Sequence, residues 1–381
     1  MIPYGKHKIF PSDIDAVTKV LDGGFLTQGE QVPLFEQAVC DYTGANYAIA
    51  CNSGTSGLHI ACMALDVSKN DIVWTVPNSF VASANCARYC DADVDFVDID
   101  PATRNICLQS LEQKLIEANK TQRIPKVLVV VHFSGSSCDM KSIAQLTSPY
   151  NIKIIEDAAH ALGASDPNGN KVGLCTYSSL CVFSFHPVKS ITSAEGGMVL
   201  TNNADVASKL RCLATHGITR DVSLFDNEHV DAPWFYAQLE LGFNYRLSDI
   251  HAALGRSQLL QLDNFVAARV TLAKRYNQLL ADLPITLPLM DESSSWHLYT
   301  IELLTHDRKN VFNALRAGGI GVNVHYIPIH YHPYYKALGF EPGMYPNAEG
   351  YYANAITLPL YPTLSFEDQD KVVKQLSEAL R

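Results

Sequence analysis

The sequence lacks a long apolar segment and carries fewer cationic than acidic residues. No apolar run approaches the roughly 20 residues that a membrane-spanning helix needs, and residues 1–6 show no hydrophobic region of the kind found in signal peptides. With 29 Lys and Arg against 39 Asp and Glu, the formal net charge is -10, which argues against a nucleic-acid partner. We therefore expect a cytoplasmic protein that binds neither membranes nor nucleic acid.

Metal-site and disulfide patterns are also absent. The ten cysteines lie between Cys40 and Cys212, and no two of them form a Cys-x-x-Cys motif. Reduced thiols in the core of a cytoplasmic protein explain this distribution better than zinc ligands or disulfides do. His325, His330 and His332 lie close together in the sequence without an acidic or cysteine complement. The sequence therefore predicts no metal site.

Short apolar runs alternate with helical patterns in the first half of the chain. The 381 residues, 47% of them hydrophobic, suffice for one large and one small domain. Expected strands lie at 47–51, 72–76, 94–97, 127–132, 152–156 and 178–185, and expected helices at 11–22, 55–65, 79–90, 108–119 and 139–147. This alternation predicts an α/β domain with a mostly parallel sheet and helices on both faces.

The second half of the chain is less regular. A further strand at 198–201 and a helix at 204–214 precede a stretch at 221–241 that is rich in aspartate and aromatic residues and predicts a mobile loop. One long helix is expected over 247–281, followed by short strands at 299–304 and 322–326 and helices at 309–317 and 366–380. We predict a large α/β domain with an N-terminal segment over residues 1–250 and a small α+β domain over 251–381.

Lys189 stands out because of its surroundings. It follows the apolar run 177–185 and precedes Gly196, Gly197 and a second apolar stretch. A lysine in such a setting can lose solvation, lower its pKa and become an amine nucleophile, as chemistry on pyridoxal 5'-phosphate (PLP) requires. A surface lysine on a loop is the alternative, and the local sequence leaves both open.

Asp157 directly follows the expected strand 152–156. An acid at the carboxyl end of a strand in an open α/β sheet lies where ligands bind. A carboxylate at that place can keep the pyridine nitrogen of PLP protonated. A helix N-cap is the alternative for Asp157. The distance along the chain to Lys189 leaves room for another strand or two.

Small residues connect the expected strand 47–51 to the expected helix 55–65. Gly54, Thr55 and Ser56 would expose backbone N–H groups at a helix N-terminus, which favours an anion such as phosphate, and the two hydroxyls add donors. The segment is neither a Walker loop nor a Gly-x-Gly-x-x-Gly fingerprint. A nicotinamide-dependent oxidoreductase is therefore not favoured.

Together these segments resemble the DegT/DnrJ/StrS sugar aminotransferases, which are fold-type-I PLP enzymes. The resemblance covers essentially the whole chain, and its motifs lie at 26–29, 75–82, 156–161, 183–186, 195–197, 216–217, 242–246 and 324–326. Segments 233–236, 244–253 and 323–328 carry a closer likeness to the nucleotide-sugar 4-aminotransferases of pseudaminic acid biosynthesis. The resemblance implies a large, mostly parallel-sheet domain and a smaller α+β C-terminal domain.

The resemblance also implies roles for individual residues around PLP. Lys189 would bond to the cofactor and then act as general base and acid, and Asp157 would pair with the pyridinium. His160 and His186 would either tune the cofactor or serve as core histidines. The implied cofactor contacts are Gly54, Thr55, Phe80, Asp157, Ser184, Lys189 and Asn244. Phe80 would stack on the ring or pack in the core, and Asn244 would reach the phosphate in the neighbouring subunit or form a turn.

The substrate contacts implied by the resemblance come from several segments. They are Tyr4, Leu26, Thr27, Gln28, Gly29, Ser56, Arg246, Asn323, Val324, His325 and Tyr326. Arg246 would meet either the carboxylate of the amino donor or a phosphate. If Asn244 serves the neighbouring site, the active unit is a homodimer with shared active sites.

The implied reaction moves an amino group from L-glutamate, which leaves as 2-oxoglutarate, to C4 of a nucleotide 4-keto sugar. The closer likeness points to a UDP-linked 2-acetamido-2,6-dideoxy-4-hexulose. A perosamine-type or 4-amino-arabinose-type enzyme and a non-catalytic binding protein on the same fold are the alternatives. Relatives that dehydrate sugars carry histidine where this chain has Lys189, so the lysine favours amino transfer.

Overall fold

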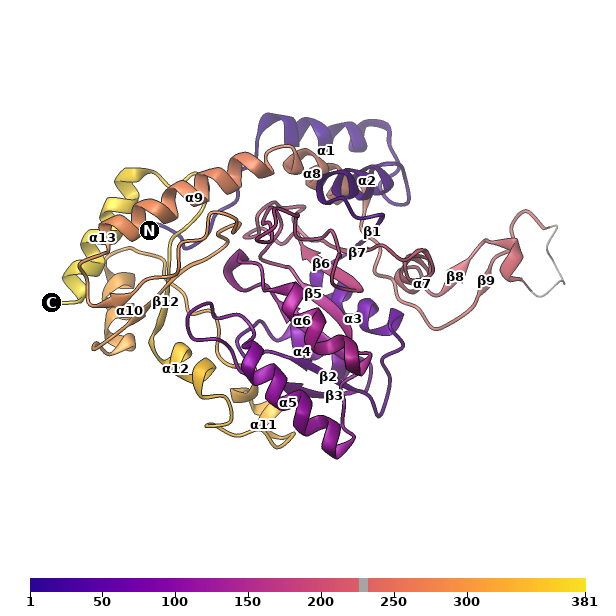
Figure 1. The fold of residues 1–381 in the computed structure, drawn as a ribbon. Coiled ribbons are helices and arrows are strands. Elements are labelled where there is room, and N and C mark those ends of the chain that lie inside the picture. Colours follow the sequence, from indigo (N-terminus) through magenta and orange to yellow (C-terminus); the bar gives the residue numbers. More distant parts are fainter. Residues whose placement is uncertain (226–231) are drawn as a thin grey trace.

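The computed structural model describes residues 1–225 and 232–381 of the chain. Part of the loop predicted at 221–241, residues 226–231, therefore lies outside the described residues. Figure 1 shows a large lobe built around a central sheet and a smaller lobe that holds the C-terminus. A narrow arm, which carries β8 (Ile218–Thr219) and β9 (Ala237–Gln238), projects from the large lobe.

The large lobe is organised by a seven-stranded sheet of order β1-β7-β6-β5-β4-β2-β3. Its strands are β1 (Tyr47–Cys51), β2 (Ile72–Thr75), β3 (Asp93–Phe96), β4 (Val127–Val131), β5 (Lys153–Asp157), β6 (Leu180–Ser184) and β7 (Gly197–Thr201). Strand β7 runs antiparallel to both of its neighbours, and the remaining strands are parallel to one another. The mostly parallel sheet predicted from the sequence is confirmed.

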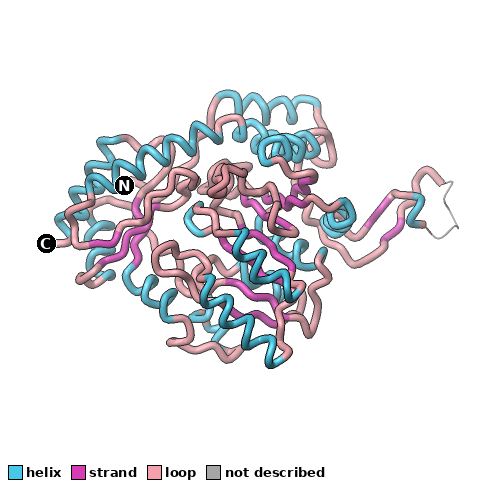
Figure 2. The backbone as a smooth tube through the Cα atoms, in the orientation of Figure 1, coloured by secondary structure: helices cyan, strands magenta, loops and turns pink. Residues whose placement is uncertain are grey.

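Helices cover both faces of this sheet (Figure 2). They are α3 (Gly54–Ala64), α4 (Ala82–Tyr89), α5 (Leu108–Thr121), α6 (Met140–Thr147) and α7 (Ala204–Ala214). Side chains alternate along a strand, so strands β1, β6 and β7 contribute to two apolar cores. Ile49 and Val182 pack in one core, while Ala50 and Phe183 pack in the other. Strand β4 is apolar and buried at every position, as expected for a central strand covered on both faces, and all of its residues belong to the first core.

The N-terminal helices pack against the connection between the lobes. Helices α1 (Pro11–Gly23) and α2 (Gln31–Thr43) lie against α8 (Asp249–Leu259), which is followed by α9 (Leu262–Leu279). The prediction of a single helix over 247–281 is therefore wrong. The amides of Leu260 and Gln261 bond to carbonyls three residues back, which tightens the turn and ends α8 there.

The smaller lobe contains an antiparallel sheet of β10 (Ile285–Thr286), β11 (Tyr299–Leu303) and β12 (Ala355–Leu358). The remaining helices are α10 (Arg308–Ala317), α11 (Pro333–Lys336), α12 (Pro346–Asn354) and α13 (Phe366–Ala379). The strand predicted at 322–326 does not form, because only Asn323 makes a β-bridge, to Thr357, and the Tyr326 amide donates to the Asn78 side chain.

The N-terminal segment extends to the smaller lobe, where Ile2 forms a parallel bridge with Ile320. The Leu360 amide also donates to the Tyr4 carbonyl. The division of the chain near residue 250 stays a prediction. No helix in the described part of the chain is both long enough and apolar enough to cross a membrane.

Candidate active site

A cavity of about 510 Å³ lies at the carboxyl ends of three neighbouring parallel strands. Val131, Asp157 and Ser184, the last residues of β4, β5 and β6, line it. This is the edge of an open α/β sheet at which ligands bind. Residues of the smaller lobe, including His297 and His325, complete the lining.

The cavity brings together thirteen of the residues predicted from the sequence. They are Tyr4, Gly54, Thr55, Phe80, Asp157, His160, Ser184, His186, Lys189, Asn323, Val324, His325 and Tyr326. Their motifs are distant in the sequence and meet only through the topology of the sheet and the position of the smaller lobe.

Lys189 lies in the loop that follows β6, and its amide donates to the His186 carbonyl at 2.9 Å. Lys189 is half-buried, and part of its surface faces the cavity. Burial lowers the pKa of Lys189 to about 8, although the negative charge of Asp157 acts in the opposite direction. At pH 7, roughly a tenth of such an amine is unprotonated. Lys189 is thus a usable base and nucleophile near neutral pH.

The buried carboxylate of Asp157 has two hydrogen-bond donors from the protein. The Ser83 hydroxyl donates to Oδ2 at 2.6 Å, and the Ala159 amide donates to Oδ1 at 3.2 Å. The N-cap alternative fails, because turns rather than a helix follow β5. A carboxylate offers about four acceptor positions, so Asp157 keeps acceptor capacity for a group bound in the cavity.

The N-terminus of α3 forms one wall of the cavity and fits an anion. The Ser53 side chain caps the helix by accepting from the Ser56 amide at 3.0 Å. Gly54 permits a close approach to β6, because a Cβ at that position would lie 2.9 Å from the Ser184 Cβ. The Ser184 hydroxyl therefore lies beside the first turn of α3, where backbone N–H groups favour a phosphate.

Neutral histidines line the side of the cavity nearest the smaller lobe. His160 Nε2 bonds to the Tyr326 hydroxyl at 3.0 Å, and its ring lies 4.4 Å from the ring of His297, centroid to centroid. Burial is the main cause that lowers the pKa of both histidines well below the usual value, and the charge of Lys189 adds to it. Both rings are therefore uncharged at neutral pH.

His325 and Tyr4 form the outer part of this wall. Their ring centroids are 5.5 Å apart, and His325 Nδ1 bonds to the Thr357 hydroxyl at 2.8 Å. Burial, with a smaller contribution from Lys189, lowers the pKa of His325 to about 3. His186 also lines the cavity, but its side chain is exposed.

Seven of the predicted residues lie outside the cavity of this chain: Leu26, Thr27, Gln28, Gly29, Ser56, Asn244 and Arg246. Ser56 serves the start of α3 instead, because its buried hydroxyl donates to Asn52 Oδ1 at 2.5 Å. Asp249 anchors the turn that contains Gly29 by accepting its amide hydrogen at 2.8 Å. Asn244 is exposed, and Arg246 Nε has no hydrogen-bond partner among the described residues.

Two residues that were not predicted from the sequence contribute to the site, one in the lining and one behind it. His297 lines the cavity, although it lies outside all of the motifs and enters the site through the fold alone. Ser83 follows Ser79 by four residues, and two hydroxyls at this spacing next to the Phe80 motif were a usable signal.

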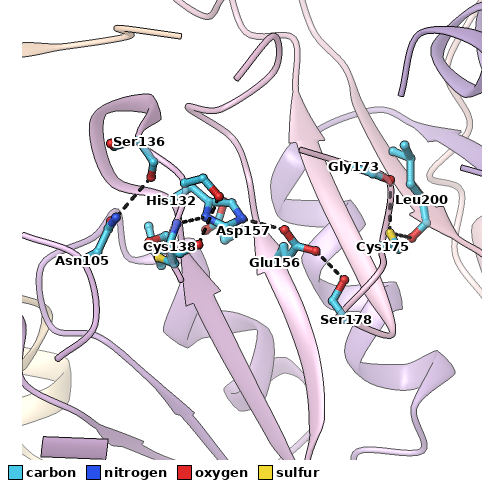
Figure 3. Close-up of polar contacts among 12 residues, drawn as sticks. Asn105, His132, Ser136, Cys138, Glu156, Asp157, Gly173, Cys175, Ser178 and Leu200 are labelled. Atoms are coloured by element: carbon cyan, nitrogen blue, oxygen red, sulfur yellow. Dashed lines mark hydrogen bonds and ion pairs between the residues drawn. The ribbon is translucent and has the colours of Figure 1, made fainter. Parts of the chain in front are cut away.

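Glu156, which precedes Asp157 on β5, does not line the cavity. It lies in a polar network with His132 and Ser178 (Figure 3). His132 Nε2 donates to Glu156 Oε2 at 2.7 Å, and the Ser178 hydroxyl donates to Oε1. The Cys138 amide donates to Nδ1 at 3.0 Å, so the ring of His132 is neutral and carries its proton on Nε2.

The groups around the cavity fit PLP. The N-terminus of α3 suits its phosphate, Asp157 suits its pyridine nitrogen and Lys189 suits its aldehyde. Phe80, which is exposed in this chain, is available to cover one face of the ring. Within residues 1–225 and 232–381, no three His, Cys, Asp or Glu side chains gather in a way that could hold a metal ion.

Comparisons with known proteins agree with this chemistry. Residues 8–377 match the DegT/DnrJ/EryC1/StrS aminotransferase family. Over 374 residues, the chain is 39% identical to the UDP-4-amino-4,6-dideoxy-N-acetyl-beta-L-altrosamine transaminase of Campylobacter jejuni, with 97% of this chain and 94% of the relative covered. It is 33% identical to the spore coat polysaccharide biosynthesis protein SpsC of Bacillus subtilis, with 100% and 97% covered.

Solved structures give the same result. PseC of Helicobacter pylori, an aminotransferase involved in the biosynthesis of pseudoaminic acid, matches with a TM-score of 0.89 at 30% identity, with 100% of this chain and 99% of that one covered. The PMP form of the putative sugar aminotransferase Spr1654 of Streptococcus pneumoniae matches with a TM-score of 0.90 at 27% identity and the same coverage. The chain therefore belongs to the DegT/DnrJ/EryC1/StrS aminotransferase family and is a PLP-dependent sugar aminotransferase.

Proposed function

We propose that this enzyme transfers the amino group of L-glutamate to C4 of a UDP-linked 2-acetamido-2,6-dideoxy-4-hexulose on the route to pseudaminic acid. The observation that carries the proposal is the single cavity that joins Lys189, Asp157 and the N-terminus of α3. The choice of sugar rests on two relatives: the Campylobacter jejuni transaminase, which is named for a UDP-linked 4-amino-4,6-dideoxy sugar, and the Helicobacter pylori aminotransferase, which is described as involved in the biosynthesis of pseudoaminic acid. A perosamine-type or 4-amino-arabinose-type substrate is the alternative, and a cytoplasmic location stays a prediction.

Three groups of the chain hold the cofactor in this proposal. The first turn of α3, with Gly54 and Thr55, and the Ser184 hydroxyl bind the phosphate. Asp157 accepts the N–H of the pyridinium, and Phe80 covers one face of the ring. When bound, PLP supplies the electron sink that stabilises negative charge at the reacting carbon.

Lys189 moves the protons. Its lowered pKa, about 8, provides an unprotonated amine near neutral pH. In the first half of the reaction this amine would take the proton from Cα of L-glutamate and pass it to the bound cofactor. In the second half it would take that proton back from the cofactor and deliver it to C4 of the sugar. The neutral rings of His160, His297 and His325 can orient substrate hydroxyls without adding positive charge beside Lys189.

The cavity of one chain has too few cationic side chains to bind such substrates. Lys189 is the only lysine or arginine in the lining, counted over the described residues. The carboxylate of L-glutamate and the diphosphate of the sugar nucleotide both need cationic or amide donors. A second copy of the chain would supply them.

A homodimer with shared active sites meets this need. Asn244 and Arg246 lie outside the cavity of their own chain, and the loop of Leu26, Thr27 and Gln28 is exposed. The arm around β8 and β9 also exposes apolar side chains, among them Val222, Leu224, Trp234 and Leu241. An exposed apolar set of this kind is typical of a protein interface. We therefore assign Asn244 to the phosphate of the partner's cofactor and Arg246 and residues 26–29 to the partner's substrate.

An absorbance experiment on the purified, cofactor-loaded enzyme tests both halves of the reaction. The visible band of the lysine-linked cofactor should disappear when L-glutamate is added. It should return when the UDP-linked 4-keto sugar is added, and mass spectrometry should show the 4-amino sugar. Matched GDP- and dTDP-linked 4-keto sugars serve as controls. Return of the band with one of these and not with the UDP sugar would overturn the proposed substrate while leaving amino transfer intact.

A further inference from the structure

Two buried hydroxyls connect the start of α4 to Asp157. The Ser83 hydroxyl lies 2.6 Å from Asp157 Oδ2, and the Ser79 hydroxyl lies 2.7 Å from that of Ser83. The exposed fractions of Ser83, Ser79 and Asp157 are 0%, 4% and 6%. Only the buried Ser83 is fully shielded from solvent, so its hydroxyl bonds to Asp157 rather than to water.

The direction of both hydrogen bonds follows from chemistry. An ionised carboxylate only accepts, so the Ser83 hydroxyl must donate to Asp157. With its proton committed, the Ser83 oxygen accepts from the Ser79 hydroxyl. Both O–H dipoles therefore point toward Asp157 and stabilise its negative charge, and each strengthens the other.

Ser83 acts on the cavity only through Asp157. Ser79, Phe80 and Ala82 line the cavity, whereas Ser83 does not. The Ser83 amide donates to the Phe80 carbonyl at 3.2 Å, so one turn places Phe80 at the cavity and the hydroxyl of Ser83 on the carboxylate. This turn fixes the stacking side chain and the acid relative to each other.

We propose that Ser83, supported by Ser79, is a positioning residue that holds the Asp157 carboxylate oriented toward the pyridine nitrogen of PLP. Without these donors, the carboxylate would be free to rotate away from the ring. A rotated Asp157 holds the pyridine proton less well and weakens the electron sink. The inference rests on the proposed pairing of Asp157 with the cofactor and not on the identity of the sugar.

The test uses the intact enzyme loaded with PLP that carries nitrogen-15 in its ring. The nitrogen chemical shift reports the protonation of the pyridine, and single-turnover absorbance with L-glutamate reports the first half-reaction. For Ser83→Ala we expect the shift to move toward the unprotonated value and the rate to fall about 10- to 100-fold, as is typical when a partner that orients a ligating group is removed. Ser79→Ala should change both in the same direction and less. Ser83→Thr, which keeps the hydroxyl, should restore both.

Ser178→Ala is the matched control, because it removes a serine donor from Glu156, the neighbouring acid. It should leave the nitrogen shift unchanged. If Ser83→Ala and Ser79→Ala leave the shift and the rate within about twofold of the parent while Asp157→Asn changes both, the serines only fill space and the inference is overturned. If Asp157→Asn itself leaves the shift unchanged, the proposed pairing of Asp157 fails, and the inference fails with it.

Discussion

Glu156 and Asp157 are neighbours on β5 and almost equally buried, with exposed fractions of 5% and 6%. Side chains alternate along a strand, so the two acids face opposite sides of the sheet. Glu156 is enclosed by His132 and Ser178 (Figure 3), and Asp157 lines the cavity. Burial alone therefore does not distinguish a structural acid from a functional one. The two acids differ because Asp157 keeps acceptor positions that face the cavity, whereas Glu156 does not line it.

The histidines near the two acids also differ in whether their hydrogen bonds are complete. Beside Glu156, both ring nitrogens of His132 have a partner, one in Glu156 and one in the Cys138 amide. On the cavity side, Nδ1 of both His160 and His297 is buried without a hydrogen-bond partner in the described part of the chain. Unfilled capacity of this kind suits a site that gains its remaining partners when ligands bind.

Removal of the Lys189 amine should have the largest effect on activity. For Lys189→Ala we expect loss of the visible cofactor band and a fall in turnover of about 10⁴-fold or more, because general acid–base catalysis and the covalent link are lost together. Lys153→Ala, at the exposed start of β5, is the control and should behave as the parent. Normal turnover by the Lys189 variant would refute the proposed mechanism.

Removal of the Asp157 carboxylate should have the second largest effect. Asp157→Ala should lower the rate of amino transfer by about 10²–10⁴-fold, a fall of the size that loss of one charge-stabilising group commonly produces. Stopped-flow absorbance with L-glutamate measures the step directly. A rate close to that of the parent would remove Asp157 from its assigned role.

Glu156→Gln should give the opposite result to the Asp157 variant. An amide can accept from only one of the two donors around Glu156, and its NH₂ group faces the other, so the free energy of unfolding should fall by about 1–3 kcal/mol. Turnover per folded molecule should change little, because Glu156 does not line the cavity. Urea unfolding of the cofactor-free protein measures the stability, with Glu117→Gln, at an exposed position of α5, as the control. If the Glu156 variant lost activity and kept its stability, Glu156 would have a functional role, and the assignment of a purely structural role to it would be wrong.

The sequence predicted what is periodic or local. Unbroken apolar runs predicted β4 and β6 because both faces of these strands are covered, and the carboxyl-end rule placed Asp157 at the binding edge. The local surroundings pointed to Lys189, and the resemblance added the small-lobe residue His325. The structure places both at the cavity, because their signals lie within a single element or motif, and their roles stay predictions.

The features that were missed depend on contacts between distant segments. The stretch 322–326 has an apolar pattern, yet side chains of Asn78 and Asn323 take backbone amides that a strand would offer to a neighbour. His297 reaches the cavity only because the smaller lobe packs over the large one. Seven predicted residues stay outside the cavity of one chain. Ser56 serves the start of α3, and a second copy of the chain is the proposed reason for the other six.

The smallest expected effect concerns the titration of Lys189 in the cofactor-free enzyme. Its modification by an amine-specific reagent should reach half its maximum near pH 8, whereas an exposed lysine continues to gain reactivity until about pH 10.4. The negative charge of Asp157 favours the ammonium form, so Asp157→Asn should move the midpoint below 8, and Glu156→Gln should leave it unchanged. Because the folded protein releases this proton at a lower pH than the unfolded chain does, Lys189 should also make stability rise with pH from about 8 upward. Mass spectrometry of the labelled peptide, with Lys153 as the internal reference, measures the midpoint. Equal midpoints in Asp157→Asn and Glu156→Gln would show that the charge of Asp157 does not affect the pKa of Lys189 more than the charge of Glu156 does.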